Sequence, residues 1–185
     1  MKRMETNSEV YKWIMPSIKN RSLKTVPDDG AFNFRIEMAR QQEQLPIVDR
    51  EKIIEYVNEF LEAAGMQRID NPHVKPKDRE KRRFDYAKIN EISPQDIIWI
   101  KFTTDNYISV IGTSCDISFS EYAKNNTPAG IINKVLDKEW DEKDVLIFPL
   151  IGMPEQFYRS DIESGVGNYL ISKGVPILDY YSHNY

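Results

Sequence analysis

The spacing of apolar residues divides this chain into a helical first part and a strand-rich second part. Up to residue 65, apolar side chains recur every three or four positions, which is typical of helices that pack on one face. From Gln95 onward the spacing changes to two, which is typical of half-buried strands. The pattern therefore predicts a mixed α/β fold.

Two helices are predicted in the first part, after a turn at residues 27–30. The first covers residues 31–44, where Phe32, Ile36 and Ala39 share one face. The second begins after Asp49, a residue suited to capping, and ends at Gly65. Its apolar stripe predicts a helix that packs against the core and comprises Ile53, Ile54, Val57, Phe60, Leu61 and Ala64.

A β-hairpin is predicted next, with strands at residues 97–102 and 107–111 and a four-residue loop between them. Residues 116–119 suggest a short third strand. A helix then begins at Thr127 and Pro128, because threonine caps a helix well and proline fits its first turn.

The last part of the chain reads as strand, helix and strand. Residues 144–150 are almost continuously apolar, a helix is predicted from Ser160 to Gly174, and residues 175–178 form a second apolar run. We expect a parallel β-α-β unit with neighbouring strands. The predicted fold is thus amino-terminal helices packed on a mixed sheet of four or five strands.

The charge pattern suggests three regions, which we expect to form one compact unit. Residues 1–70 are helical, residues 71–83 form a basic loop or linker, and residues 84–185 form the mixed α/β region. Residues 1–83 carry 17 Lys/Arg against 14 Asp/Glu, whereas residues 84–185 carry 8 against 15. Contact with nucleic acid is therefore expected only from the first part, because phosphate binding needs concentrated positive charge.

The basic loop is the first candidate binding site. It is followed by Phe84 and Tyr86, and basic residues interleaved with aromatic ones are typical of surfaces that bind single-stranded nucleic acid. A solvated linker explains the same composition. The candidate residues for contact with a partner or nucleic acid are Lys75, Lys77, Arg79, Lys81, Arg82 and Arg83.

The carboxyl ends of the two strands in the β-α-β unit are the candidate catalytic site, since ligands bind at that edge in parallel sheets. The predicted catalytic residues are Arg159, Asp161, Glu163, Asp179 and His183. A structural explanation competes, because residues 160–163 match a capping box in which Ser160 and Glu163 satisfy the first turn of the helix. Gly165 and Gly167 in this helix are expected to serve close packing rather than close approach of a ligand.

Composition excludes several classes of protein. A hydrophobic fraction of 41% with 11% aromatics can fill a core, so the chain is not globally disordered. No apolar run is long enough to cross a membrane, and Cys115 is the single cysteine, which excludes an intrachain disulfide and favours a cytoplasmic location. The phosphate-binding loop, the dinucleotide fingerprint, the HExxH zinc motif, CxxC and GxSxG are all absent.

Two hypotheses for function remain. The first is an intracellular, non-enzymatic binding or inhibitory protein of phage or mobile-element origin, which engages nucleic acid or a protein that handles nucleic acid. The second is a small hydrolase or transferase that acts on a nucleotide or nucleic acid through the candidate catalytic residues. No cofactor is expected under the first hypothesis, and only the second allows a divalent metal ion. The sequence does not determine the oligomeric state.

Overall fold

The computed structural model describes residues 10, 12–14, 29–74, 96–114 and 127–179. Its core is one antiparallel sheet of four strands in the order β1-β4-β2-β3. The strands are β1 (His73–Val74), β2 (Ile97–Thr103), β3 (Ile108–Ser114) and β4 (Trp140–Pro149), and the helices are α2 (Asp29–Gln42), α3 (Arg50–Ala63), α5 (Pro128–Val135) and α6 (Arg159–Ser172). The mixed α/β character predicted from the sequence is confirmed.

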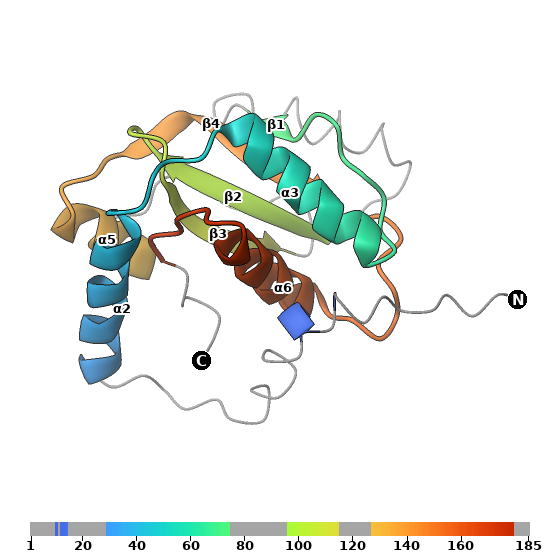
Figure 1. Cartoon of the computed structure of the whole chain (residues 1–185), viewed down its shortest axis with the longest axis horizontal. Coiled ribbons are helices and arrows are strands. Elements are labelled where there is room, and N and C mark those ends of the chain that lie inside the picture. The colour runs from blue at the N-terminus through green and yellow to red at the C-terminus, as the bar shows by residue number, and fades with distance from the viewer. Residues whose placement is uncertain (1–9, 11, 15–28, 75–95, 115–126, 180–185) are drawn as a thin grey trace, which may run out of the picture.

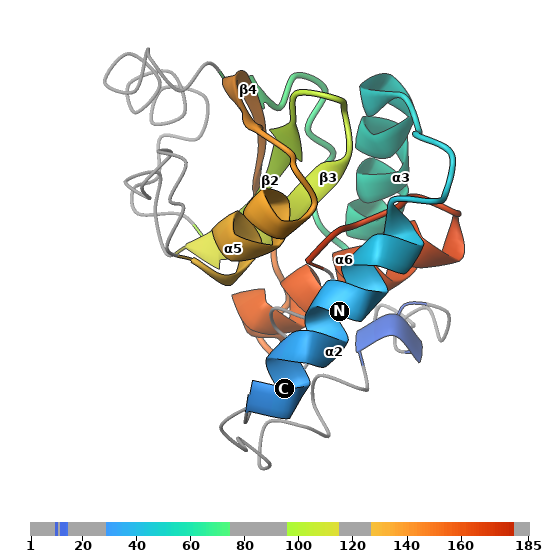
Figure 2. The ribbon, with the colours of Figure 1, turned by 90° about the vertical axis from the view of Figure 1, so that its left-hand side faces the viewer.

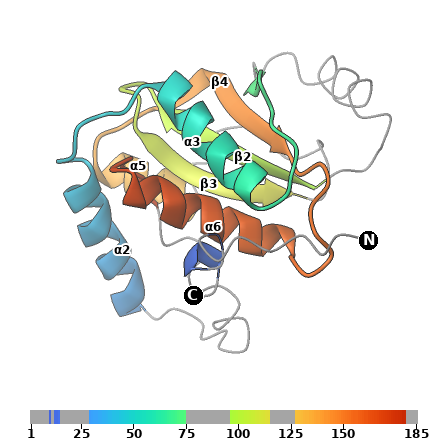
Figure 3. The same ribbon diagram turned by 45° about the vertical axis from the view of Figure 1, so that its right-hand side comes forward.

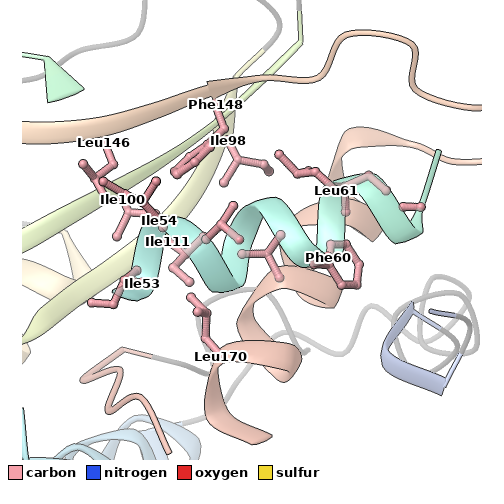
Figure 4. Packing of buried hydrophobic residues seen from close by; sticks show 14 of the residues in the cluster. Ile53, Ile54, Phe60, Leu61, Ile98, Ile100, Ile111, Leu146, Phe148 and Leu170 are labelled. Carbon is pink, nitrogen blue, oxygen red and sulfur yellow. The ribbon is translucent and has the colours of Figure 1, made fainter. Parts of the chain in front are cut away.

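Helices α3 and α6 lie side by side across one face of the sheet (Figure 1, Figure 3). The stripe predicted for α3 is buried against apolar residues of α6 and of the inner strands, and Figure 4 shows this packing from close by. Ile98, Ile100 and Phe102 point to this face from alternate positions of β2. Burial of one such side chain contributes roughly 1.5–3 kcal/mol, so this layer makes a large contribution to the stability of the fold.

The other two helices, α2 and α5, lie together at one end of the sheet (Figure 1, Figure 2). They share a second, smaller core of Ala39, Ile132 and Leu178. Leu178 belongs to the segment that follows α6, so three regions distant in sequence meet at this end.

The hairpin prediction is confirmed, with β2 and β3 joined at residues 104–107. Helix α5 begins as predicted, since the Thr127 hydroxyl accepts a hydrogen bond from the Gly130 N–H at 3.2 Å. Gly65 and Gly174 follow α3 and α6 with positive φ, as their stop signals predict. The turn expected at residues 27–30 is wrong at Asp29 and Gly30, which lie in the first turn of α2.

The parallel β-α-β unit and the mixed sheet are not confirmed, because all four strands pair in antiparallel fashion. β4 lies between β1 and β2, and within the described part of the chain no segment after α6 pairs with it. The segment after α6 instead forms an isolated parallel bridge between Ile177 and Ile108 at the outer edge of β3. Pro176, which has no N–H, also limits pairing along this segment.

Gly165 sets the distance between α6 and its neighbours. A Cβ atom at this position would lie 2.5 Å from the Phe60 Cζ atom and 2.9 Å from the Ile14 Cγ1 atom. The expected packing role is therefore confirmed at this glycine.

Replacing Gly165 with alanine should lower the melting temperature of the protein. The added methyl group overpacks the contact with Phe60, at a cost of about 1–3 kcal/mol, which exceeds the gain of up to about 1 kcal/mol in helix propensity. Ser172→Ala, at an exposed position of the same helix, is the control and should leave the melting temperature within a few degrees. Thermal unfolding followed by circular dichroism measures both, and an unchanged melting temperature for Gly165→Ala would contradict the packing role.

Candidate functional site

The predicted catalytic residues of the described part lie at two different ends of the sheet. The Arg159 guanidinium contacts the Asp96 carboxylate at 3.3 Å, next to the first residue of β2. The Asp179 N–H donates to the Ser109 carbonyl at 2.9 Å, near the first residue of β3. These two ends are separated by about five residues of strand, or roughly 16 Å, because Ile97 pairs with Ser114 in the β2–β3 ladder. The structure therefore does not bring Arg159 and Asp179 together.

Asp161 serves the start of α6. Its carboxylate accepts a hydrogen bond from the Tyr158 N–H at 2.8 Å, and its side chain is fully buried. The capping contact expected from Ser160 and Glu163 is wrong by two residues, since the cap position is Tyr158 and the residue that reaches back to it is Asp161. Glu163 lies further along the helix and is also buried.

Asp179 forms a buried ion pair with Arg35 of α2. The guanidinium donates to both carboxylate oxygens, at 2.7 and 2.8 Å from Nη2, with a further bond of 3.1 Å from Nε. The two side chains are only 8% and 1% exposed. Such a pair holds its elements firmly, because separating the partners would leave a charge buried without compensation.

His183 and the basic-loop residues Lys75, Lys77, Arg79, Lys81, Arg82 and Arg83 lie outside the described residues, as do Cys115 and the suggested strand at 116–119. Within the described ranges, no three His, Cys, Asp or Glu side chains are placed to hold a metal ion. No helix in those ranges is long and apolar enough to cross a membrane.

A polar pocket of about 620 Å³ lies between α5 and the start of β4. It is lined by Gly130, Asn133 and Lys134 of α5, by residues 137–140 and by Glu142, and we refer to it as the α5–β4 pocket. Sequence reasoning did not identify it. The signal that marks it is the run of five acids in residues 137–144 around Trp140, directly after a short helix.

The floor of the α5–β4 pocket is joined to the ion pair of Arg35 and Asp179. The Ser109 hydroxyl donates to the Asn133 Oδ1 atom at 2.8 Å, while the Ser109 carbonyl accepts from the Asp179 N–H. Asn133 is 2% exposed, and its Nδ2 atom has no hydrogen-bond partner within the described part of the chain. The Trp140 Nε1 atom is buried and equally lacks an acceptor among the described residues.

Some charged side chains of the pocket form ion pairs and others do not. Lys138 is bound by Asp105 at 2.6 Å and lies 4.3 Å from the centre of the Tyr107 ring. The carboxylates at the mouth are exposed and form no ion pair with a described residue; they belong to Asp137, Glu139 and Glu142. The mouth therefore has an excess of negative charge.

A second charged cluster binds two further acids of residues 137–144, Asp141 and Asp144, which do not line the pocket. Arg50, at the first position of α3, donates to Asp141 at 2.7 Å and to Asp144 at 3.0 Å, and its guanidinium carbon lies 4.1 Å from the centre of the Phe102 ring. His73 bridges Asp144 and Glu51 at 2.9 and 3.0 Å. Burial lowers the pKa of the His73 imidazole, but the hydrogen bonds to the two carboxylates outweigh burial, so its pKa is raised.

Comparison with models of protein families, with curated proteins and with solved structures finds no match to this chain.

Breaking the buried ion pair should strongly destabilise the fold. Arg35→Met leaves the Asp179 carboxylate buried without its guanidinium, so the free energy of unfolding should fall by about 3–5 kcal/mol. Urea denaturation measures this change. Glu37→Gln, an exposed position of the same helix, is the control and should change stability by less than about 0.5 kcal/mol. A loss for Arg35→Met no larger than that of the control would contradict the role of the pair.

The contribution of His73 to stability should fall as the pH rises. Because the pKa is raised on folding, the charged imidazole is favoured in the folded state. The contribution is complete below the unfolded pKa of about 6.5 and is lost as the pH rises through the folded pKa. The difference in unfolding free energy between the wild type and His73→Asn should be larger at pH 5.5 than at pH 9. NMR titration should give a lower His73 pKa in Glu51→Gln than in the wild type. A difference that is constant with pH would contradict this assignment.

Proposed function

We propose that this protein is a binding or inhibitory protein that engages a protein partner through the acidic mouth of the α5–β4 pocket. The observation that carries the proposal is the set of three exposed carboxylates, from Asp137, Glu139 and Glu142, around the α5–β4 pocket. Charges placed at the rim of a contact steer association and select partners of opposite sign.

A partner that handles nucleic acid fits this surface. Proteins that bind phosphate backbones carry concentrated positive charge, and an acidic surface complements that charge. The excess of acids in residues 84–185 supports the same choice, with 15 Asp/Glu against 8 Lys/Arg. Direct binding of nucleic acid to this mouth is disfavoured by like charge.

The enzyme hypothesis draws no support from the described residues. Asp161 caps α6, Asp179 is bound by Arg35, and Arg159 lies at another end of the sheet from Asp179. A general acid and a general base must reach the same reacting group, at about 2.6–3.2 Å or through one water molecule.

Capture from a lysate of the source cells, with and without nuclease, tests the proposal. The triple variant Asp137→Asn, Glu139→Gln, Glu142→Gln lacks the complementary charge. It should capture at least tenfold less of the specific partner than the wild type does. Nuclease should not change capture by the wild type.

The matched control is Glu37→Gln, Glu62→Gln, Glu155→Gln, which removes the same charge from exposed positions away from the pocket. It should retain the partner. Equal capture by the wild type and the pocket variant, or capture that disappears with nuclease, would overturn the proposal.

A further inference from the structure

His73 connects three elements at one edge of the sheet. It is the first residue of β1, its Nδ1 atom lies 2.9 Å from the Asp144 carboxylate of β4, and its Nε2 atom lies 3.0 Å from the Glu51 carboxylate of α3. Each nitrogen of the ring therefore faces a negatively charged acceptor. Only the protonated imidazole satisfies both carboxylates, because it carries two N–H groups whereas the neutral ring carries one.

Loss of the proton leaves one ring nitrogen with a lone pair turned toward a carboxylate oxygen. The contact with Glu51 is the one that breaks, because that side chain is 74% exposed and water can solvate it. Asp144 is only 21% exposed and also binds Arg50 at 3.0 Å, so it keeps the remaining N–H of the ring. Among the described residues, the charged groups around the imidazole are Glu51 and Arg50 of α3 and Asp144 and Asp141 of β4.

β1 is the element that yields when this contact is lost. It has two residues and stands at the end of the strand order, so within the described part of the chain it pairs only with β4. Pro72, just before it, accepts a hydrogen bond from the Ile147 N–H at 2.9 Å but has no N–H to return. α3 and β4 are held together independently, by the apolar core and by Arg50. A segment with so few pairings opens locally at a lower free energy than the whole fold.

We propose that His73 is a pH-sensitive latch for this edge of the sheet. The imidazolium fastens β1 to the first turn of α3, and loss of its proton releases Glu51 and loosens β1 on β4 while the rest of the fold stays closed. Burial lowers the pKa of His73, and the hydrogen bonds to Asp144 and Glu51 raise it by more, so the closed strand favours the charged ring. The latch is therefore closed at low pH and loosens as the pH rises through the folded pKa. His73 does not line the α5–β4 pocket, so the latch and the proposed function stand or fall separately.

Solvent exchange of the Ile147 amide, measured by NMR on the full chain between pH 5.5 and pH 8.5, tests the latch. The protection factor is the intrinsic exchange rate divided by the measured one, and it should fall severalfold across this range, because the Pro72 carbonyl leaves this amide whenever β1 opens. The fall should be up to tenfold for each unit by which the His73 pKa, measured by NMR titration, exceeds its ordinary value of about 6.5. The Leu178 amide, bonded to the Ile108 carbonyl at the opposite edge of the sheet, is the internal control and should change less than about twofold.

Two variants separate the latch from a merely structural role of His73. In Glu51→Gln, the amide can accept from the charged ring and donate to the neutral one, so the protection of Ile147 should vary with pH much less than in the wild type. His73→Asn carries no group that titrates in this range and should show no pH dependence at Ile147. Glu37→Gln, at an exposed position of α2, removes the same charge as Glu51→Gln and should behave as the wild type does.

Three results would each overturn the latch. The first is protection of Ile147 that stays constant with pH in the wild type. The second is an equal fall at Leu178, because β1 would then open only together with the rest of the sheet. The third is the same pH dependence in Glu51→Gln as in the wild type, because the contact between His73 and Glu51 would then play no part in it.

Discussion

The ion pair between Arg35 and Asp179 is the constraint on which one end of this protein depends. It connects α2 to the segment after α6, and Asp179 in turn bonds to the backbone of β3. Desolvating the two charges is costly, and the three hydrogen bonds between them offset that cost. The pair thereby keeps the segment on the outer edge of β3, which would otherwise present unpaired backbone groups.

One side of the α5–β4 pocket is connected to this ion pair by hydrogen bonds. Asn133 is fixed by Ser109, whose carbonyl is bound by the N–H of Asp179, so one continuous set of hydrogen bonds leads from the buried charges to the floor of the pocket. Binding sites built on helices and strands hold their geometry better than sites on loops. The carboxylates at the mouth come from the turn after α5 and from the start of β4.

Local structure was largely predictable from the sequence, whereas the pairing of distant segments was not. The period of the apolar residues located α3 and the hairpin because each element buries one face. It could not reveal that β4 lies between β1 and β2, since an apolar run is the same whichever strands lie beside it. The capping contact at Asp161 was shifted because Tyr158, not a typical cap residue, precedes α6. The pocket was missed because its buried groups, from Asn133 and Trp140, meet only through tertiary packing.

The separation of Arg35 and Asp179 in the sequence has a consequence for how the chain is made. The two residues are 144 positions apart, so the ribosome must add 144 residues after Arg35 before the guanidinium can meet its carboxylate. The hairpin forms from neighbouring residues and is available much earlier, with the outer edge of β3 still uncovered. During synthesis this edge is open to pairing with other nascent chains, and synthesis of residues 177–179, which bond to it, ends that interval.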